Sequence, residues 1–256
     1  MALQIKGTYI RIAWVVFLGL VICGLFSAIS NKKKASVEEL KVNINPIDGE
    51  FAMLTSQEVD NELLKTLGIN VKGIPVGKLD LERIEAIVKT NPYVKDADVY
   101  VNTNNQLEVN LTQKIPILRI MDNNGNQYYL DDLGSKIPIS KHYSPRVLIV
   151  SGGLPPYQND FQTAGRTMLS DIFLLTKYIN EHEFWHAMID QIHVNGVGDI
   201  LLIPQIGQQK ILFGNIENID EKFHRLEVFY KEAMSTVGWN KYEILDVRFK
   251  GQVVCK

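Results

Sequence analysis

Cysteine is nearly absent from this sequence. Cys23 and Cys255 are the two examples among 256 residues, the first within an apolar run and the second next to the last position. Two thiols so far apart in the sequence do not form the framework of a disulfide-stabilised domain. We therefore expect both thiols to be unpaired.

An excess of basic residues is also absent. The sequence holds 27 lysines and arginines against 29 aspartates and glutamates, which gives a formal net charge of −2. A nucleic-acid-binding protein needs a basic face, and this balance therefore predicts no nucleic-acid partner. No period of about 20–50 residues repeats, which argues against a solenoid or a propeller. Hydrophobic residues make up 46% of the chain, enough for one or two domains with a sizeable core.

The longest uncharged stretch lies near the N-terminus, from Ile12 to Ser30. As a helix this stretch spans about 28 Å, close to the ~30 Å hydrocarbon core of a bilayer. A cleaved signal peptide is the alternative, with Ala28 and Ser30 as the small residues at the cleavage site, but signal cores have only about 7–15 apolar residues. We predict one uncleaved transmembrane helix over residues 12–30, between a short tail of residues 1–11 and a polar tether of residues 31–39.

The charges beside this stretch do not fix its orientation. Lys6 and Arg11 precede it, and three lysines, Lys32, Lys33 and Lys34, follow it. The positive-inside rule therefore favours neither side clearly, and a long C-terminal domain is translocated despite flanking charge. The residues alone leave both orientations open.

Residues 40–115 show the pattern of a small domain with the element order β-α-α-β-β. Residues 40–44 alternate like a strand. A capping box of Thr55 and Glu58 predicts the start of a helix that ends at Gly68. The apolar face expected for this helix consists of Val59, Leu63 and Leu67, with Leu64 beside them.

A second helix and a hairpin complete this domain. Asp80 is the expected N-cap, and the helix ends before Asn91-Pro92 because the residue before a proline avoids the helical region. Two alternating strands follow, and residues 103–105 form the turn between them. One helix pair covers one face of a three-stranded sheet of this kind. The expected core positions here are Leu81, Ile84, Val88, Ala97, Val99, Val101, Leu107, Val109 and Leu111.

Residues 116–256 are richer in strands. Two hairpins are predicted, one around residues 123–126 and one around residues 206–209, and the chain ends in residues 242–256 with the pattern strand, turn at Lys250-Gly251, strand. Two helices are expected, over residues 165–180 and 220–237. Their apolar stripes are core faces, made of Met168, Ile172, Leu175 and Ile179 in the first and Phe223, Leu226, Tyr230, Ala233 and Val237 in the second.

Several stretches carry a family resemblance that covers nearly the whole chain. They are FAMLTSQEV from Phe51, DLERIEAIVKTNPYVKDADVYV from Asp80, LEVNLTQKIPILRI from Leu107, YYLDDLGSKIPIS from Tyr128, and the segment from Trp239 to Val254. In these stretches the sequence resembles the FtsQ/DivIB cell-division proteins, in the version found in Bacteroidota-type bacteria. The first domain is similar to a POTRA domain. The fold class that follows is α+β: one transmembrane helix, a POTRA-like domain at 40–115 and a strand-rich FtsQ-type domain at 116–256.

The resemblance implies a function without catalysis and without a cofactor. It implies a single-pass (type II) protein of the cell inner membrane at the division site, with a short cytoplasmic tail and both domains in the periplasm. Its role would be that of a scaffold that bridges early and late division proteins during septum formation. The implied partners are FtsB-like and FtsL-like coiled-coil proteins, FtsK-like and FtsW-like membrane proteins, and the lipid bilayer.

The C-terminus is the expected site of partner binding. In the family the partner site lies on the last strand and the residues after it, which corresponds here to Arg248, Phe249, Lys250, Gly251, Gln252 and Val253. An open strand edge offers unpaired N–H and C=O groups to a partner strand. Phe249 would be the apolar anchor, worth about 2 kcal/mol if fully buried, and Gly251 would permit close backbone approach. The alternative is that residues 244–254 form an internal strand of the sheet.

The stretch HEFWH at residues 182–186 offers a competing hypothesis. It matches H-E-x-x-H, in which His182 and His186 would hold zinc and Glu183 would activate a water. The longer form of this motif needs glycine and histidine where the chain has Ile189 and Ile192, and the stretch after His186 has the pattern of a strand. We expect no metal site and no catalytic residue. The resemblance instead implies that Phe184 and Trp185 are core anchors.

Three classes of function therefore remain. The first is the division scaffold, which we favour. The second is a POTRA-bearing envelope transport or assembly factor, which would contact outer-membrane proteins. The third is a membrane-anchored zinc hydrolase acting through His182, Glu183 and His186.

Overall fold

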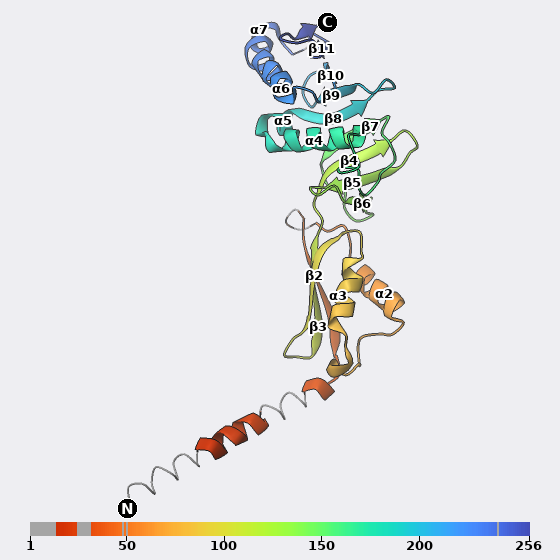
Figure 1. The fold of residues 1–256 in the computed structure, drawn as a ribbon, viewed down its shortest axis with the longest axis vertical. Helices are drawn as coiled ribbons and strands as arrows, with labels where there is room; N and C mark the ends of the chain where they lie inside the picture. Colours follow the sequence, from red (N-terminus) through yellow and green to blue (C-terminus); the bar gives the residue numbers. More distant parts are fainter. Residues whose placement is uncertain (1–13, 25–31, 48, 50, 240) are drawn as a thin grey trace, which may run out of the picture. The chain divides into compact units, whose positions relative to one another are not determined.

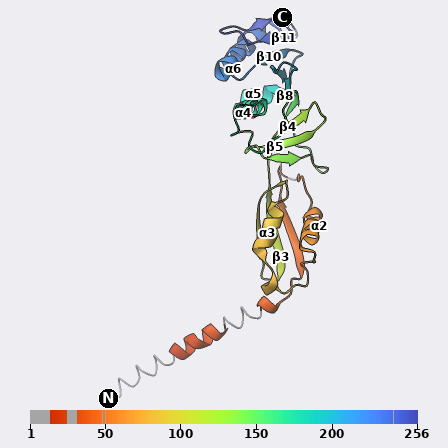
Figure 2. The same cartoon turned by 45° about the vertical axis from the view of Figure 1, so that its right-hand side comes forward.

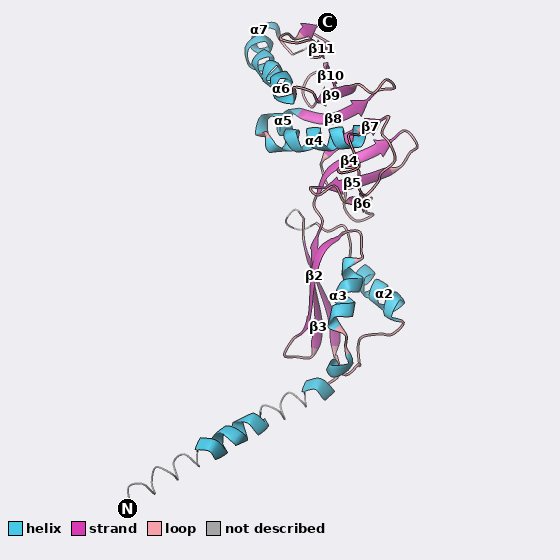
Figure 3. Ribbon diagram, in the orientation of Figure 1, coloured by secondary structure: helices cyan, strands magenta, loops and turns pink. Residues whose placement is uncertain are grey.

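A computed structural model describes residues 14–24, 32–47, 49, 51–239 and 241–256 (Figure 1). Its internal contacts divide the chain into two compact units, Met1–Gln113 and Lys114–Lys256. Both units contain helices and strands (Figure 3), in agreement with the predicted α+β class. Both cysteines are free.

The N-terminal apolar stretch is only partly described. Residues 14–24 form a helix. The predicted tail of residues 1–11 lies outside the described residues, as do both ends of the predicted span from Ile12 to Ser30. None of the helices within the described ranges is long and apolar enough to cross a membrane.

Residues 39–113 of the first unit form one three-stranded sheet, two α-helices and a short 3₁₀ turn. The sheet order is β1-β3-β2, in which β1 is parallel and β2 antiparallel to β3. Helices α2 and α3 lie together on one face of this sheet (Figure 1). The elements are β1 (Glu39–Asn45), α2 (Ser56–Leu67), the 3₁₀ turn η1 (Val76–Lys78), α3 (Leu81–Lys89), β2 (Val94–Val101) and β3 (Gln106–Gln113).

The predicted helix ends of this unit are confirmed. Thr55 and Glu58 form the reciprocal capping box, and Gly68 ends α2 in the left-handed region at φ 70°. The Asp80 side chain accepts a hydrogen bond from the backbone N–H of Arg83 at the start of α3. Most of the expected core is buried between helices and sheet, at Val59, Leu63, Ile84, Val88, Ala97, Val99, Leu107, Val109 and Leu111.

The second unit is built on a mixed nine-stranded sheet of order β12-β11-β10-β9-β8-β7-β4-β5-β6. Helices α4, α5 and α6 lie to one side of its strands (Figure 2). The strands are β4 (Pro116–Asp122), β5 (Gln127–Asp131), β6 (Lys136–Pro138), β7 (Leu148–Gly152), β8 (Ile189–Val194), β9 (Ile200–Pro204), β10 (Lys210–Gly214), β11 (Ile244–Asp246) and β12 (Val254–Cys255). The helical elements are α4 (Met168–Glu181), α5 (Glu183–Met188), α6 (Ile219–Val228), the π-helix η2 (Phe229–Ala233) and α7 (Met234–Val237).

Three expectations for this unit need correction. Helix α4 begins three residues later than predicted, because Thr167 caps it by accepting from the N–H of Ser170. The helix predicted over residues 220–237 changes to π-helical hydrogen bonding at Phe229–Ala233. The two C-terminal strands are short, and a loop over residues 247–253 replaces the long paired stretch that the sequence pattern predicts.

Candidate partner-binding edge

Strand β12 is the first strand of the nine-stranded sheet and pairs on one side only, with β11. The pairing is antiparallel, with Cys255 opposite Leu245 and Val254 opposite Asp246. Among the described residues β12 is therefore an edge strand, whereas β11, which opens the stretch 244–254, lies inside the sheet between β10 and β12. The other edge of the sheet is β6.

The hydrogen-bond pattern shows which backbone groups of β12 are available. Lys256 donates its N–H to the carbonyl of Ile244 at 3.0 Å, and the N–H of Ile244 donates back to the carbonyl of Lys256 at 3.1 Å. In an antiparallel ladder such hydrogen-bonded pairs alternate with pairs whose N–H and C=O groups point away from the partner strand. Cys255 belongs to the second kind. Its N–H and C=O therefore face away from β11, toward the open side of the sheet.

The residues expected to bind a partner lie in the loop that joins β11 to β12. Phe249 is 50% exposed, which leaves its ring free to be covered. Gly251 has φ 73°, a conformation that a side chain would strain. Val253 packs against the core. The sequence pattern placed most of these residues on the last strand, whereas the structure places them in the loop before it, and Cys255 lies on the edge strand itself.

Arg248 is held within the chain by two carboxylates. Its guanidinium donates to both carboxylate oxygens of Asp246, at 3.0 and 2.8 Å, and to Asp199 at 3.0 Å. Asp246 is 2% exposed, and the hydrogen bonds from Arg248 hold the pKa of its carboxyl below the ordinary value. Arg248 therefore fixes the start of the loop with three of its five N–H donors.

Arg225 on α6 holds the same loop from the other side. Its guanidinium donates to the backbone carbonyls of Val247, Phe249 and Gln252. These three acceptors span almost the whole loop, and one planar cation with several donors satisfies them at once. Arg225 was not among the residues predicted from the sequence, since no motif marks a helical arginine that binds carbonyls more than twenty positions away.

A groove lies beside this loop. It has a volume of about 430 Å³ and is bounded by residues 224–233 of α6 and η2 and by residues 251–253. Val228 contributes an apolar wall that is 40% exposed, and Val253 faces it across the groove. The groove therefore lies beside the loop residues that lead into β12.

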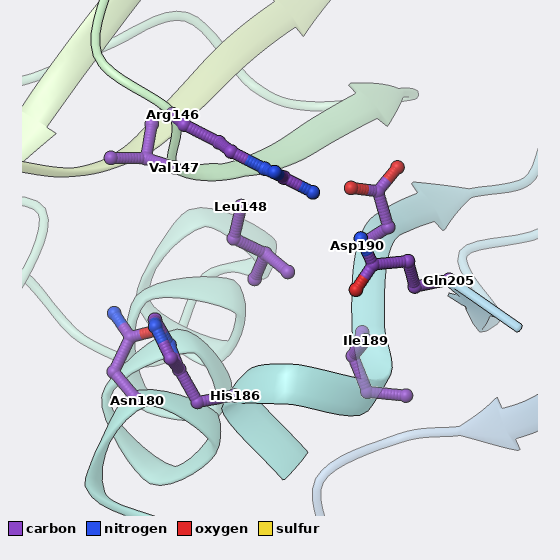
Figure 4. Close-up of a pocket in the computed structure, with 8 residues that line it drawn as sticks. All are labelled: Arg146, Val147, Leu148, Asn180, His186, Ile189, Asp190 and Gln205. Atoms are coloured by element: carbon purple, nitrogen blue, oxygen red, sulfur yellow. The ribbon is translucent and has the colours of Figure 1, made fainter. Parts of the chain in front are cut away.

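The two histidines of HEFWH do not share a site. His182 lies between α4 and α5, where its Nδ1 contacts the carbonyl of Tyr178 at 2.7 Å. His186 contacts the side-chain oxygen of Asn180 at 3.1 Å, in a small pocket of about 120 Å³ that His182 does not line. In Figure 4, His186 lies beside Asn180, while Asp190 and Gln205 lie across the pocket near the end of Arg146.

Within the described part of the chain, no three histidine, cysteine, aspartate or glutamate side chains are grouped so that they could hold a metal ion. The strand predicted after His186 is confirmed, since β8 begins at Ile189. Trp185 is buried as expected, with 2% of its surface exposed. The expectation for Phe184 is wrong, because its ring is 36% exposed and lines an apolar groove with Trp239 and Ile206.

The fold defines a two-part protein, in which a small unit with a three-stranded sheet precedes a strand-rich unit with an open sheet edge at β12. Comparison with known proteins agrees with this division. Residues 38–112 match the POTRA-like domain family, and residues 115–256 match the family described as FtsQ/DivIB, C-terminal related. The chain belongs to the FtsQ/DivIB family.

A curated relative carries the same family name. The chain is 24% identical over 206 residues to "Cell division protein FtsQ" of Rhodothermus marinus, an alignment that covers 78% of this chain and 74% of the relative. The comparisons thus agree with the resemblance seen in the sequence, and they identify the chain as a cell-division protein.

Proposed function

We propose that this chain is a non-enzymatic division scaffold that binds a partner by strand addition at β12. The observation that carries the proposal is the outward orientation of the N–H and C=O groups of Cys255 on an edge strand. An extended partner segment would pair with these groups and lengthen the sheet. Phe249 and the groove beside residues 251–253 would receive its side chains.

The family suggests which partners fit. FtsB-like and FtsL-like coiled-coil proteins would supply the added strand, and FtsK-like and FtsW-like proteins would contact the N-terminal part of the chain. Bridging of early and late division proteins then follows from one chain holding both groups. The proposed setting is the inner membrane at the septum, with residues 12–30 as the anchor and both units in the periplasm.

Two features of the loop support a preformed binding edge. Arg248 binds the carboxylates of Asp246 and Asp199, and Arg225 binds the backbone carbonyls of residues 247, 249 and 252. A segment fixed before binding loses less conformational entropy when the partner docks. No reaction step is needed for this role.

A fluorescent fusion of the full chain tests the proposed role. We expect bands at mid-cell in dividing cells, because a division scaffold works at the septum. A uniform envelope signal would contradict the proposal and would favour a POTRA-bearing transport or assembly factor. Expression at native level is the necessary control, since excess protein would obscure the bands.

A further inference from the structure

Five exposed lysines gather at one end of the first unit. They are Lys32, Lys33, Lys34, Lys72 and Lys78, and we call this group the lysine collar. The first three lie in the chain just before β1, and the other two lie in the connection between α2 and α3. Within the described ranges, none of the five forms an ion pair.

Backbone hydrogen bonds join the two segments that carry the collar. The N–H of Val37 donates to the carbonyl of Ile74 at 2.9 Å, and the N–H of Gly73 donates to the carbonyl of Val37 at 2.8 Å. The N–H of Val76 donates to the carbonyl of Ala35 at 2.8 Å. Three such bonds over so few residues hold Lys72 and Lys78 beside the first three lysines. The collar is therefore one surface of the unit.

Charge is distributed unevenly over this unit. Residues 32–113 contain nine lysines and one arginine against thirteen acidic residues. Half of these basic residues are in the collar, whereas four acidic residues flank the same segments, namely Glu38, Glu39, Asp80 and Glu82. The rest of the unit is consequently acidic. An anionic surface would attract the collar and repel the opposite end, which orients the unit.

The position of the collar in the chain points to the partner. Residue 24 ends the described helix of the apolar stretch, and Lys32 follows eight positions later. A fully extended chain covers at most about 3.5 Å per residue, so eight residues place Lys32 no more than roughly 28 Å from the end of that helix. If residues 12–30 form the proposed anchor, Lys32 is two positions beyond it, at the level of the lipid headgroups.

We propose that the lysine collar docks on the anionic headgroups of the bilayer that holds the anchor. This inference rests on the membrane anchor of the proposed function. Each lysine near an anionic bilayer surface strengthens association by about fivefold, and salt screens the effect. Lys72 and Lys78 lie on a segment that is hydrogen-bonded to the residues just before β1. Docking through these two lysines would therefore turn the N-terminal end of β1 toward the bilayer.

Acetylation of lysines in the reconstituted full-length chain tests the proposal. The chain is inserted into vesicles of phosphatidylcholine alone or of phosphatidylcholine mixed with phosphatidylglycerol, treated with acetic anhydride, and analysed by mass spectrometry. We expect acetylation of Lys72 and Lys78 to slow by about fivefold on the anionic vesicles and to recover at high salt. Lys95 is the internal control, because it is exposed and lies at the end of β2 away from the turn at residues 103–105.

A matched pair of variants supplies the second test. Replacing Lys72 and Lys78 together with glutamine should reduce the protection of Lys32, Lys33 and Lys34, whereas the same change at Lys65 and Lys95 should not. Equal acetylation of Lys72 and Lys78 on both vesicles, in a chain that resists an alkaline wash, would overturn the docking surface alone. Uniform slowing that includes Lys95 would also count against it. Release of the chain from the vesicles by the alkaline wash would contradict the proposed membrane anchor, and the docking proposal would then fail as well.

Discussion

Replacing Cys255 with proline would change the open side of β12 and leave its pairing with β11 intact. Proline has no N–H, and the N–H of Cys255 faces away from β11, so no hydrogen bond of the sheet depends on it. The residue before proline is restricted to extended backbone, which Val254 already has in β12. The substitution should therefore remove the site of strand addition while the unit stays folded.

The size of the effect follows from the bond that is lost. A backbone hydrogen bond contributes about 0.5–1.5 kcal/mol, and a partner carbonyl left unsatisfied costs about 1–3 kcal/mol. The second cost already includes the lost bond, so we expect a loss of about 1–3 kcal/mol, which weakens partner binding by about 5- to 150-fold. The free energy of unfolding should change by no more than about 1 kcal/mol.

Crosslinking in cells measures this loss. A photo-crosslinker at Phe249 is combined with native Cys255, with Cys255→Ala and with Cys255→Pro, and the yield of the adduct with a small coiled-coil partner is compared. Alanine keeps the N–H and should give nearly the native yield, whereas proline should abolish the adduct. Urea unfolding of the purified variants checks the fold. Equal adduct yields from the alanine and proline variants, both stably folded, would refute strand addition at this edge.

The remaining predictions concern the loop, the core and the histidine stretch. Arg225→Ala should lower the free energy of unfolding by about 2 kcal/mol in urea titrations, because charged hydrogen bonds to three loop carbonyls are lost. It should also lower the yield of the partner adduct formed by a photo-crosslinker at Phe249. An unchanged yield would show that partner binding does not depend on the loop being held by Arg225. Gly152→Ala should cost roughly 3 kcal/mol or more, because φ is 105° and a Cβ would meet the carbonyl oxygen of Val194 at 2.0 Å, whereas Gly153→Ala, with its nearest atom at 3.5 Å, should cost much less. Arg248 lowers the pKa of Asp246 in the folded state, so this pair stabilises the fold at a pH above the ordinary aspartate pKa of about 3.9. The stabilisation is lost as the pH falls below that value. Asp246→Asn should therefore reduce the pH dependence of the free energy of unfolding in this acid range. Glu183→Gln should support division normally, and the purified chain should hold far less than stoichiometric zinc; loss of function in a folded Glu183→Gln protein would revive the hydrolase hypothesis.

Local signals explain why the first unit was predictable from its sequence. The Thr55–Glu58 capping box, the N-cap Asp80 and the alternating hairpin strands each depend on residues within a few positions of one another. Such interactions leave a direct pattern in the sequence. The parallel pairing of β1 with β3 connects residues 67 positions apart, and no local pattern records it.

Tertiary contacts explain where the second unit departed from expectation. The stripe from Phe223 to Val237 fits a regular helix, and no sequence pattern marks the π-helical segment Phe229–Ala233, in which Tyr230 packs against Trp185 and Trp239. Phe184 and Trp185 are neighbours in the sequence, and the short helix α5 turns one of them inward and the other outward. Apolar character alone does not say which of two adjacent aromatic residues faces the core.

The candidate site was only partly predictable for the same reason. The family pattern led to residues 248–253, and the apolar run Val253, Val254 and Cys255 indicated a final strand. The side chains of Arg225 and Arg248 then break the paired stretch by binding loop carbonyls and carboxylates. These bonds join α6 and the start of β9 to the loop, and they place the open edge at Cys255.

Hydrogen exchange at the amide of Cys255 is the most direct test of binding through a backbone edge. The full-length chain is compared alone and in the complex purified from cells with its coiled-coil partner. We predict that exchange at Cys255 slows by about two- to tenfold in the complex, the effect of one added backbone hydrogen bond of about 0.5–1.5 kcal/mol. Exchange at Val254, already paired with Asp246, should change little. Unchanged exchange at Cys255, with new protection at some other surface of the chain, would contradict the account.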